Sequence, residues 1–98
     1  MSNDEQMAAI GRMIFERSEL RKQRSLRLQE IQQTGLALES IGNSLRSTNR
    51  DFTETLKVTN TLITGGGLDA LKTSIVDYQR IQLLLANIEA ALKNAGVD

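Results

Sequence analysis

The chain of 98 residues contains no cysteine, no histidine and no proline. Without cysteine it has no disulfide, no thiolate nucleophile and no cysteine-bound metal, and its redox compartment is left open. Without histidine it lacks the commonest general base and metal ligand. The sequence therefore predicts a protein that is not an enzyme and that binds no cofactor or metal. Because no proline interrupts the chain, any segment can continue as helix.

Aromatic residues and long apolar runs are also scarce. Only 3% of the residues are aromatic, so a core must be built from aliphatic side chains, which suits thin helix–helix contacts. The longest apolar runs, such as Leu83–Ala86, are far shorter than a membrane span or the core of a signal peptide. The acidic residues Asp4 and Glu5 disfavour a transit peptide. We therefore expect a cytoplasmic protein that does not associate with membranes.

Apolar residues recur at spacings of three and four, the pattern of a helix with one apolar side. The apolar members of one heptad frame are Met7, Ile10, Ile14, Leu28, Ile31, Leu38, Leu45, Phe52, Leu56 and Ile63. Gly35 and Gly42 fall in the same frame, where their missing side chains would let another helix approach closely. Met13 and Leu20 widen the apolar stripe on one side, as a globular bundle prefers.

Capping signals mark where helices begin. Ser2 and Glu5 have the spacing of a capping box, so a first helix is predicted over about 3–47. Two alternatives follow: either this helix continues to about residue 64, or it kinks at 47–51 and Asp51 caps a second helix over about 51–64. This second segment is rich in β-branched residues, but an isolated strand would leave its backbone groups unpaired. A strand is therefore rejected.

Three consecutive glycines, Gly65–Gly67, are predicted to form a turn, because glycine disfavours helix and permits positive φ. A last helix is predicted over about 68–94, with Lys93 and Gly96 as stop signals. Its apolar residues at spacings of three and four are Leu68, Leu71, Ile75, Tyr78, Ile81, Leu85, Ile88 and Leu92.

These elements predict a single all-α domain: an antiparallel helical hairpin or coiled-coil bundle of two or three helices. The last helix spans roughly 40 Å at 1.5 Å per residue. Against a straight first helix it can cover only about 35–64, which leaves residues 3–34 without an intrachain partner. A bend at 47–51 gives three helices instead. The apolar residues left uncovered by the straight form predict a homo-oligomer; they are Met7, Ile10, Ile14, Leu28 and Ile31.

Two motifs could carry chemistry, and both are rejected. Gly66–Thr73 places glycines before a Lys-Thr pair, but a phosphate-binding loop needs glycine where Leu71 stands. Glu16 and Glu19 share a helix face, but the di-iron motif also requires histidine. The glutamates are expected to pair with neighbouring arginines.

The only strongly charged stretch is Arg12–Arg27. It holds six basic and two acidic residues, a net charge of +4 in a neutral chain. Three interpretations remain open: a solvated polar gap in a coiled coil, a site for an acidic protein partner, or a nucleic-acid interface. Nucleic acid ranks last because no aromatic residue alternates with the arginines to stack bases.

We therefore predict a non-enzymatic protein–protein interaction module, a small self-associating adaptor, inhibitor or assembly subunit. A nucleic-acid-binding module that uses Arg12–Arg27 is the alternative. The N-terminal arm is the predicted partner-binding surface, fitted to an apolar groove with an acidic rim. Its residues are Met7, Ile10, Met13, Ile14, Phe15, Arg17, Arg21, Arg24 and Arg27.

Overall fold

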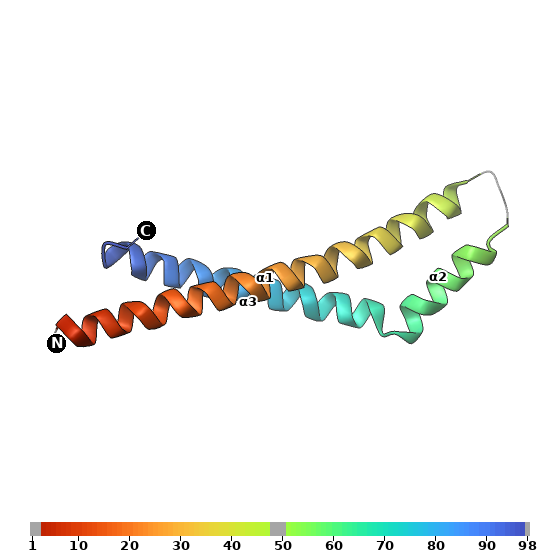
Figure 1. Cartoon of the computed structure of the whole chain (residues 1–98). Helices are drawn as coiled ribbons and strands as arrows, with labels where there is room; N and C mark the ends of the chain where they lie inside the picture. Colours follow the sequence, from red (N-terminus) through yellow and green to blue (C-terminus); the bar gives the residue numbers. More distant parts are fainter. Residues whose placement is uncertain (1–2, 48–50, 98) are drawn as a thin grey trace.

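The computed structural model describes residues 3–47 and 51–97, and these form three helices in an elongated hairpin (Figure 1). Helix α1 is Asn3–Arg46, α2 is Thr53–Thr64 and α3 is Gly67–Asn94. The predicted all-α class is confirmed, and no strand occurs among the described residues. The helices begin and end within two residues of the predicted positions. The predicted capping box includes Ser2, which lies outside the described residues.

The first helix does not continue to residue 64, so the bent three-helix alternative is confirmed. Helix α1 ends at Arg46, and α2 begins at Thr53 and returns beside α1. The predicted kink at 47–51 falls partly on residues 48–50, which lie outside the described residues. The N-cap residue of α2 is Phe52, so the predicted cap at Asp51 is wrong by one residue. Asp51 Oδ1 accepts hydrogen bonds from the backbone N–H of Thr53 at 3.1 Å and from the Thr53 hydroxyl at 2.6 Å, just before the helix.

Helix α2 is helical despite its many β-branched residues, and its threonines show how. The hydroxyls of Thr59, Thr61 and Thr64 each donate to the backbone carbonyl four residues earlier. These bonds satisfy the side chains inside the helix, although such back-bonding adds little stability. A helix of this length is marginal alone, so packing must hold it. That packing includes a hydrogen bond between the hydroxyls of Thr55, which is buried, and Ser44 of α1.

The glycine turn joins α2 to α3 for two separate steric reasons. Gly66 has φ +66°, in the left-handed region that favours glycine. Gly67 has an ordinary φ, but a Cβ there would lie 2.6 Å from the backbone oxygen of Leu62. The turn is shorter than predicted, because Gly67 already belongs to α3. At its other end α3 stops as predicted, with Gly96 at φ +81° and the Val97 N–H donating to the Leu92 carbonyl at 2.8 Å.

The core lies between α1 and α3. Leu20 of α1 packs with Ile81 and Leu85 of α3, and Ile88 covers this cluster from one side. Because the chain reverses before α2, the last helix lies mainly against the part of α1 that precedes residue 35. The length argument from a straight first helix is therefore wrong. Of the five apolar residues predicted to lack intrachain cover, Ile10 and Ile31 are half-buried.

The molecule is a thin rod of 71 × 23 × 14 Å with both chain ends at one end of it (Figure 1). Its radius of gyration is 20.7 Å, whereas a compact chain of this length has about 13 Å. A rod two helices thick can cover only one side of each helix. Many large apolar side chains are therefore exposed on the outer sides of all three helices.

Candidate protein-interaction surface

Arginines of the basic stretch form a ladder of polar contacts across the α1–α3 seam. They reach acceptors on α3, and one acidic residue of α1 joins the ladder next to them. The contacts are Arg21 Nη2 to Glu89 Oε1 at 3.4 Å, Arg24 Nη1 to Gln82 Oε1 at 2.8 Å, Arg27 Nε to Asp77 Oδ2 at 3.1 Å and Ser74 Oγ to Glu30 Oε2 at 2.8 Å. As residue numbers rise on α1 they fall on α3, so the ladder records the antiparallel register of the hairpin.

The ladder orients the helices more than it stabilises them. Arg21 and Glu89 are each about half exposed, and such surface pairs contribute about 0–1 kcal/mol. Arg27 Nε lies near Asp77 but forms no hydrogen bond with a described residue, so this contact is electrostatic only. The Ser74 hydroxyl, and after it the Arg27 guanidinium, donate to Glu30 and lower the pKa of its carboxyl. Two charges of the basic stretch, on Arg21 and Arg27, thus lie beside carboxylates across the hairpin.

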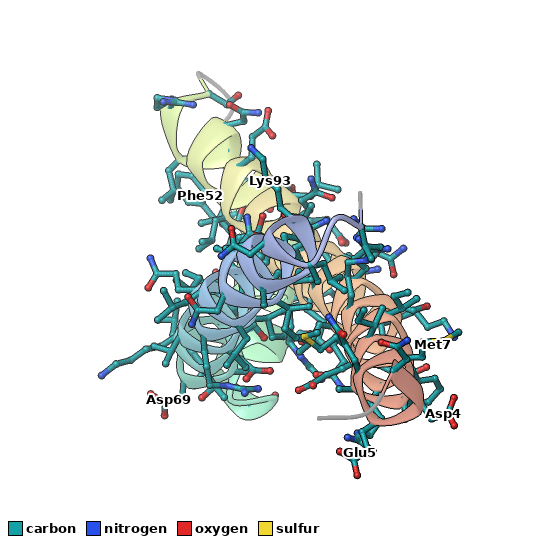
Figure 2. All side chains as sticks on the ribbon, turned by 90° about the vertical axis from the view of Figure 1, so that its left-hand side faces the viewer. Asp4, Glu5, Met7, Phe52, Asp69 and Lys93 are labelled. Carbon is teal, nitrogen blue, oxygen red and sulfur yellow. The ribbon has the colours of Figure 1, made fainter. Side chains whose placement is uncertain are left out.

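The five apolar residues of the predicted partner surface surround α1 and do not form one cluster. Ile10 and Met13 are half-buried on the side of α3. Met7 and Phe15 are 69% and 68% exposed, and Ile14 lies between these extremes at 39%. Figure 2 shows Met7 on the side of α1 that faces away from α3. At 100° per residue, adjacent residues such as Ile14 and Phe15 cannot share a face.

The basic half of the predicted surface is mostly occupied within the chain. Arg21, Arg24 and Arg27 contact α3 through the ladder, and Arg17 is half-buried. Arg17 also lines a shallow groove of about 410 Å³. The other residues of its lining are Arg21 of α1 and, from the C-terminal part of the chain, Glu89, Lys93 and Val97. The structure thus divides the nine predicted residues between a seam and an exposed surface.

The seam keeps every second position of the predicted heptad frame and, at the others, uses the residue one position earlier. Its α1 positions are Ile10, Met13, Arg17, Leu20, Arg24, Arg27, Ile31 and Thr34, all buried or half-buried. The predicted frame shares some of them but also contains Met7, Ile14 and Leu28, which are exposed. Both frames belong to one wide apolar stripe, and α3 covers one edge of it. The residues predicted only to widen the stripe, Met13 and Leu20, are in the seam.

Gly35 and Gly42 do not let a helix of the same chain approach closely. A Cβ at Gly35 would meet nothing within 4 Å, and one at Gly42 would meet only the end of the Arg46 side chain at 3.9 Å. Close packing at these glycines is therefore not part of the hairpin.

One more groove lies where α2 turns back on α1. It has a volume of about 390 Å³ and a mainly apolar lining that includes Ala37, Val58, Leu62 and Gly67. Lys57 is its only charged lining residue. Among the described residues, no three or more carboxylates, histidines or cysteines are grouped so that they could hold a metal ion.

No protein-family model, no curated protein and no solved structure matches this chain. Within the described ranges, no helix is both long enough and apolar enough to cross a membrane.

Sequence reasoning missed the exposed side of α3. Leu83 and Val76 are 65% and 57% exposed there, and neither was among the α3 residues singled out from the sequence. The sequence does contain this signal, because Leu83 belongs to a second row of residues along α3 at spacings of three and four.

Proposed function

We propose that this chain is a non-enzymatic protein–protein interaction module that works by self-association. One observation carries the proposal: the surface area of the single chain. The hairpin exposes 7416 Å², whereas a compact folded chain of 10.9 kDa exposes roughly 5,600 Å². The excess of about 1,800 Å² is larger than the roughly 800 Å² that each partner buries in a standard interface.

The balance between buried and exposed apolar residues supports the same proposal. Only Leu20, Ile81, Leu85 and Leu92 are buried hydrophobic residues among those described. A core this small stabilises a single rod weakly, and small domains often gain stability by association. The exposed apolar side chains supply the area for it.

Sedimentation velocity of the purified chain over a range of micromolar concentrations tests the proposal. We expect a dimer or larger species whose share grows with concentration. A single monomeric species at the highest concentration would overturn the proposal.

A second candidate function is capture of a different protein by the N-terminal arm. The exposure of Met7 and Phe15 favours it, together with a shallow groove along α1 that includes Phe15, Arg12 and Glu16. Because Arg21, Arg24 and Arg27 hold the hairpin register, reversing their charges would alter the fold as well as the surface. The exposed pair gives a cleaner test. Met7→Ser with Phe15→Ser should abolish capture from host extract and leave the helical content unchanged, and retained capture would exclude this arm.

Nucleic-acid binding is less well supported by the geometry. Three arginines of Arg12–Arg27 already contact acceptors on α3 or neighbouring α1. A phosphate backbone would have to compete with these contacts. Binding to random duplex DNA at low salt, with affinity that falls steeply as salt rises, would nevertheless establish this alternative.

A further inference from the structure

Helix α3 carries a second apolar row on the side opposite α1. The row runs through Leu68, Lys72, Ile75, Gln79, Leu83, Ala86 and Ala90, at spacings of three and four. Its large members are exposed, with Leu68 at 58% and Leu83 at 65%, and Val76 lies beside the row at 57%. A helix that is apolar on two opposite sides is normally covered on both. In the single chain only the side with Ile81 and Leu85 is covered.

We propose that a second copy of this chain covers this row, with the two α3 helices packed antiparallel about a two-fold axis at Gln79. The inference rests on the proposed self-association and adds the interface. A two-fold interface must be complementary to itself, because the same surface serves on both sides. The row meets this requirement in size and in charge.

The side chains of the row are complementary in size when the helices run antiparallel. With Gln79 opposite Gln79 of the second copy, Ile75 lies opposite Leu83 of the second copy. Leu68, the largest residue at one end, then lies opposite Ala90, the small residue at the other. Each large side chain meets either a small one or an aliphatic partner, as interdigitating helices require. The two central amides can hydrogen-bond to each other, which satisfies the polar residue on the axis.

The charges favour the same direction. In the antiparallel register Lys72 lies opposite Ala86 of the second copy, one turn from its Glu89 and able to reach that carboxylate. In a parallel pairing each residue would meet its own copy, so Lys72 would face a second lysine. Like charges directly opposite each other are destabilising, so the antiparallel pairing is favoured over the parallel one.

The surface required is available. Helix α3 is 28 residues long, roughly 42 Å, and its outer row runs along most of that length. Helix α1 lies on the opposite side of α3, so it does not obstruct a second copy.

Disulfide trapping tests the interface directly, because the natural chain has no cysteine and each variant then carries a single thiol. A residue on a two-fold axis lies opposite itself, within disulfide reach. Gln79→Cys should therefore form a covalent dimer under mild oxidation. Gln29→Cys, at an exposed glutamine of α1, is the control and should remain mostly monomeric on a denaturing gel. If Gln29→Cys links as fast as Gln79→Cys, or Gln79→Cys does not link, the interface is overturned.

Matched charge insertions provide the second measurement. Leu83→Glu places a carboxylate in the row, and Leu36→Glu does so at a 66% exposed leucine of α1. Leu83→Glu should raise the dissociation constant of the dimer by about a hundredfold, since the change occurs twice in a symmetric pair. Leu36→Glu should leave it unchanged, and circular dichroism should show both variants helical.

The outcomes separate the two proposals. A monomeric natural chain overturns both. A dimer that Leu36→Glu disrupts and Leu83→Glu does not upholds self-association and overturns the α3 interface. A dimer with the expected cross-link and the expected response to Leu83→Glu supports both.

Discussion

At the scale of single residues, the glycines of this chain differ in whether the fold requires a residue without a side chain. Gly66 needs a left-handed φ, and Gly67 leaves no room for a Cβ beside Leu62. Gly11 lies inside α1, where a Cβ would meet nothing within 4 Å. Of these three glycines, only Gly66 and Gly67 are therefore required by the fold.

Alanine substitutions should show this difference as opposite changes in stability. Gly67→Ala should cost about 1–3 kcal/mol from overpacking, and Gly66→Ala about 1–2 kcal/mol from the strained φ. Gly11→Ala should raise the free energy of unfolding by up to about 1 kcal/mol, because alanine favours helix. Urea denaturation followed by circular dichroism measures all three. A stabilising Gly67→Ala would show that the turn is not as tightly packed as described.

Two carboxylates make stability depend on pH. Hydrogen bonds from Ser74 and Arg27 lower the pKa of Glu30 below its usual 4.5, and those from Thr53 lower the pKa of Asp51 below its usual 3.8. A group whose pKa is lower in the folded state stabilises the fold above its unfolded pKa. That contribution is lost as the pH falls through the folded value.

We therefore expect the melting temperature to be flat near neutral pH and to fall as the pH drops below about 4.5. Glu30→Gln with Asp51→Asn should melt lower at neutral pH and lose part of this acid dependence. Calorimetry at pH 7 and pH 3.5 provides the comparison. An unchanged acid dependence in the double variant would assign the effect to other groups.

At the scale of the elements, α2 is the least anchored helix. Thr55 is its only buried residue, while Leu56 and Ile63 are exposed. A short helix with little burial opens locally at low cost. A hydrogen bond between the hydroxyls of Thr55 and Ser44 joins it to α1.

Thr55→Val should cost about 1 kcal/mol, because it removes this bond and leaves the Ser44 hydroxyl without its partner. Thr61→Val is the matched control: Thr61 is exposed and bonds only to the carbonyl of Lys57 in its own helix. We expect the control to change stability by less than about 0.5 kcal/mol. Hydrogen exchange should rise in α2 for Thr55→Val alone. Equal effects of the two substitutions would mean that the bond contributes no attachment.

The sequence predicts the positions of the helices better than it predicts which of their surfaces are buried. Helix existence and ends followed from local chemistry: the glycines at 65–67, the carboxylate of Asp51 beside Thr53 and the missing proline act on their own neighbours. The seam did not follow, because a wide apolar stripe fits two frames. Whether Leu20 or Leu28 is buried depends on where α3 lies, and that depends on the reversal after Arg46. The roles of Arg21 and Arg24 are unpredictable for the same reason, since their acceptors are 58 or more residues away.

At the scale of the whole molecule, the small core and large exposed area make stability a property of concentration. A dimer that buries the exposed area is favoured by mass action, so its melting temperature rises with protein concentration. We expect this rise over a hundredfold dilution series followed by circular dichroism. Leu83→Glu should abolish the dependence, and Leu36→Glu should keep it. A melting temperature independent of concentration in the natural chain would indicate a monomer stable by itself.

The position of both chain ends at one end of the rod also decides how the molecule responds to force (Figure 1). Tension applied beyond Asn3 and Val97 separates α1 from α3 one pair at a time, starting near Leu92 and moving toward Ser74. Such peeling requires little force, because each step breaks only a few contacts. Tension along α1, applied between Asn3 and Arg46, must stretch a continuous helix against all of its contacts with α3 at once. A single-molecule trap with handles at these two pairs of positions should therefore record a low rupture force in the first geometry and a high one in the second.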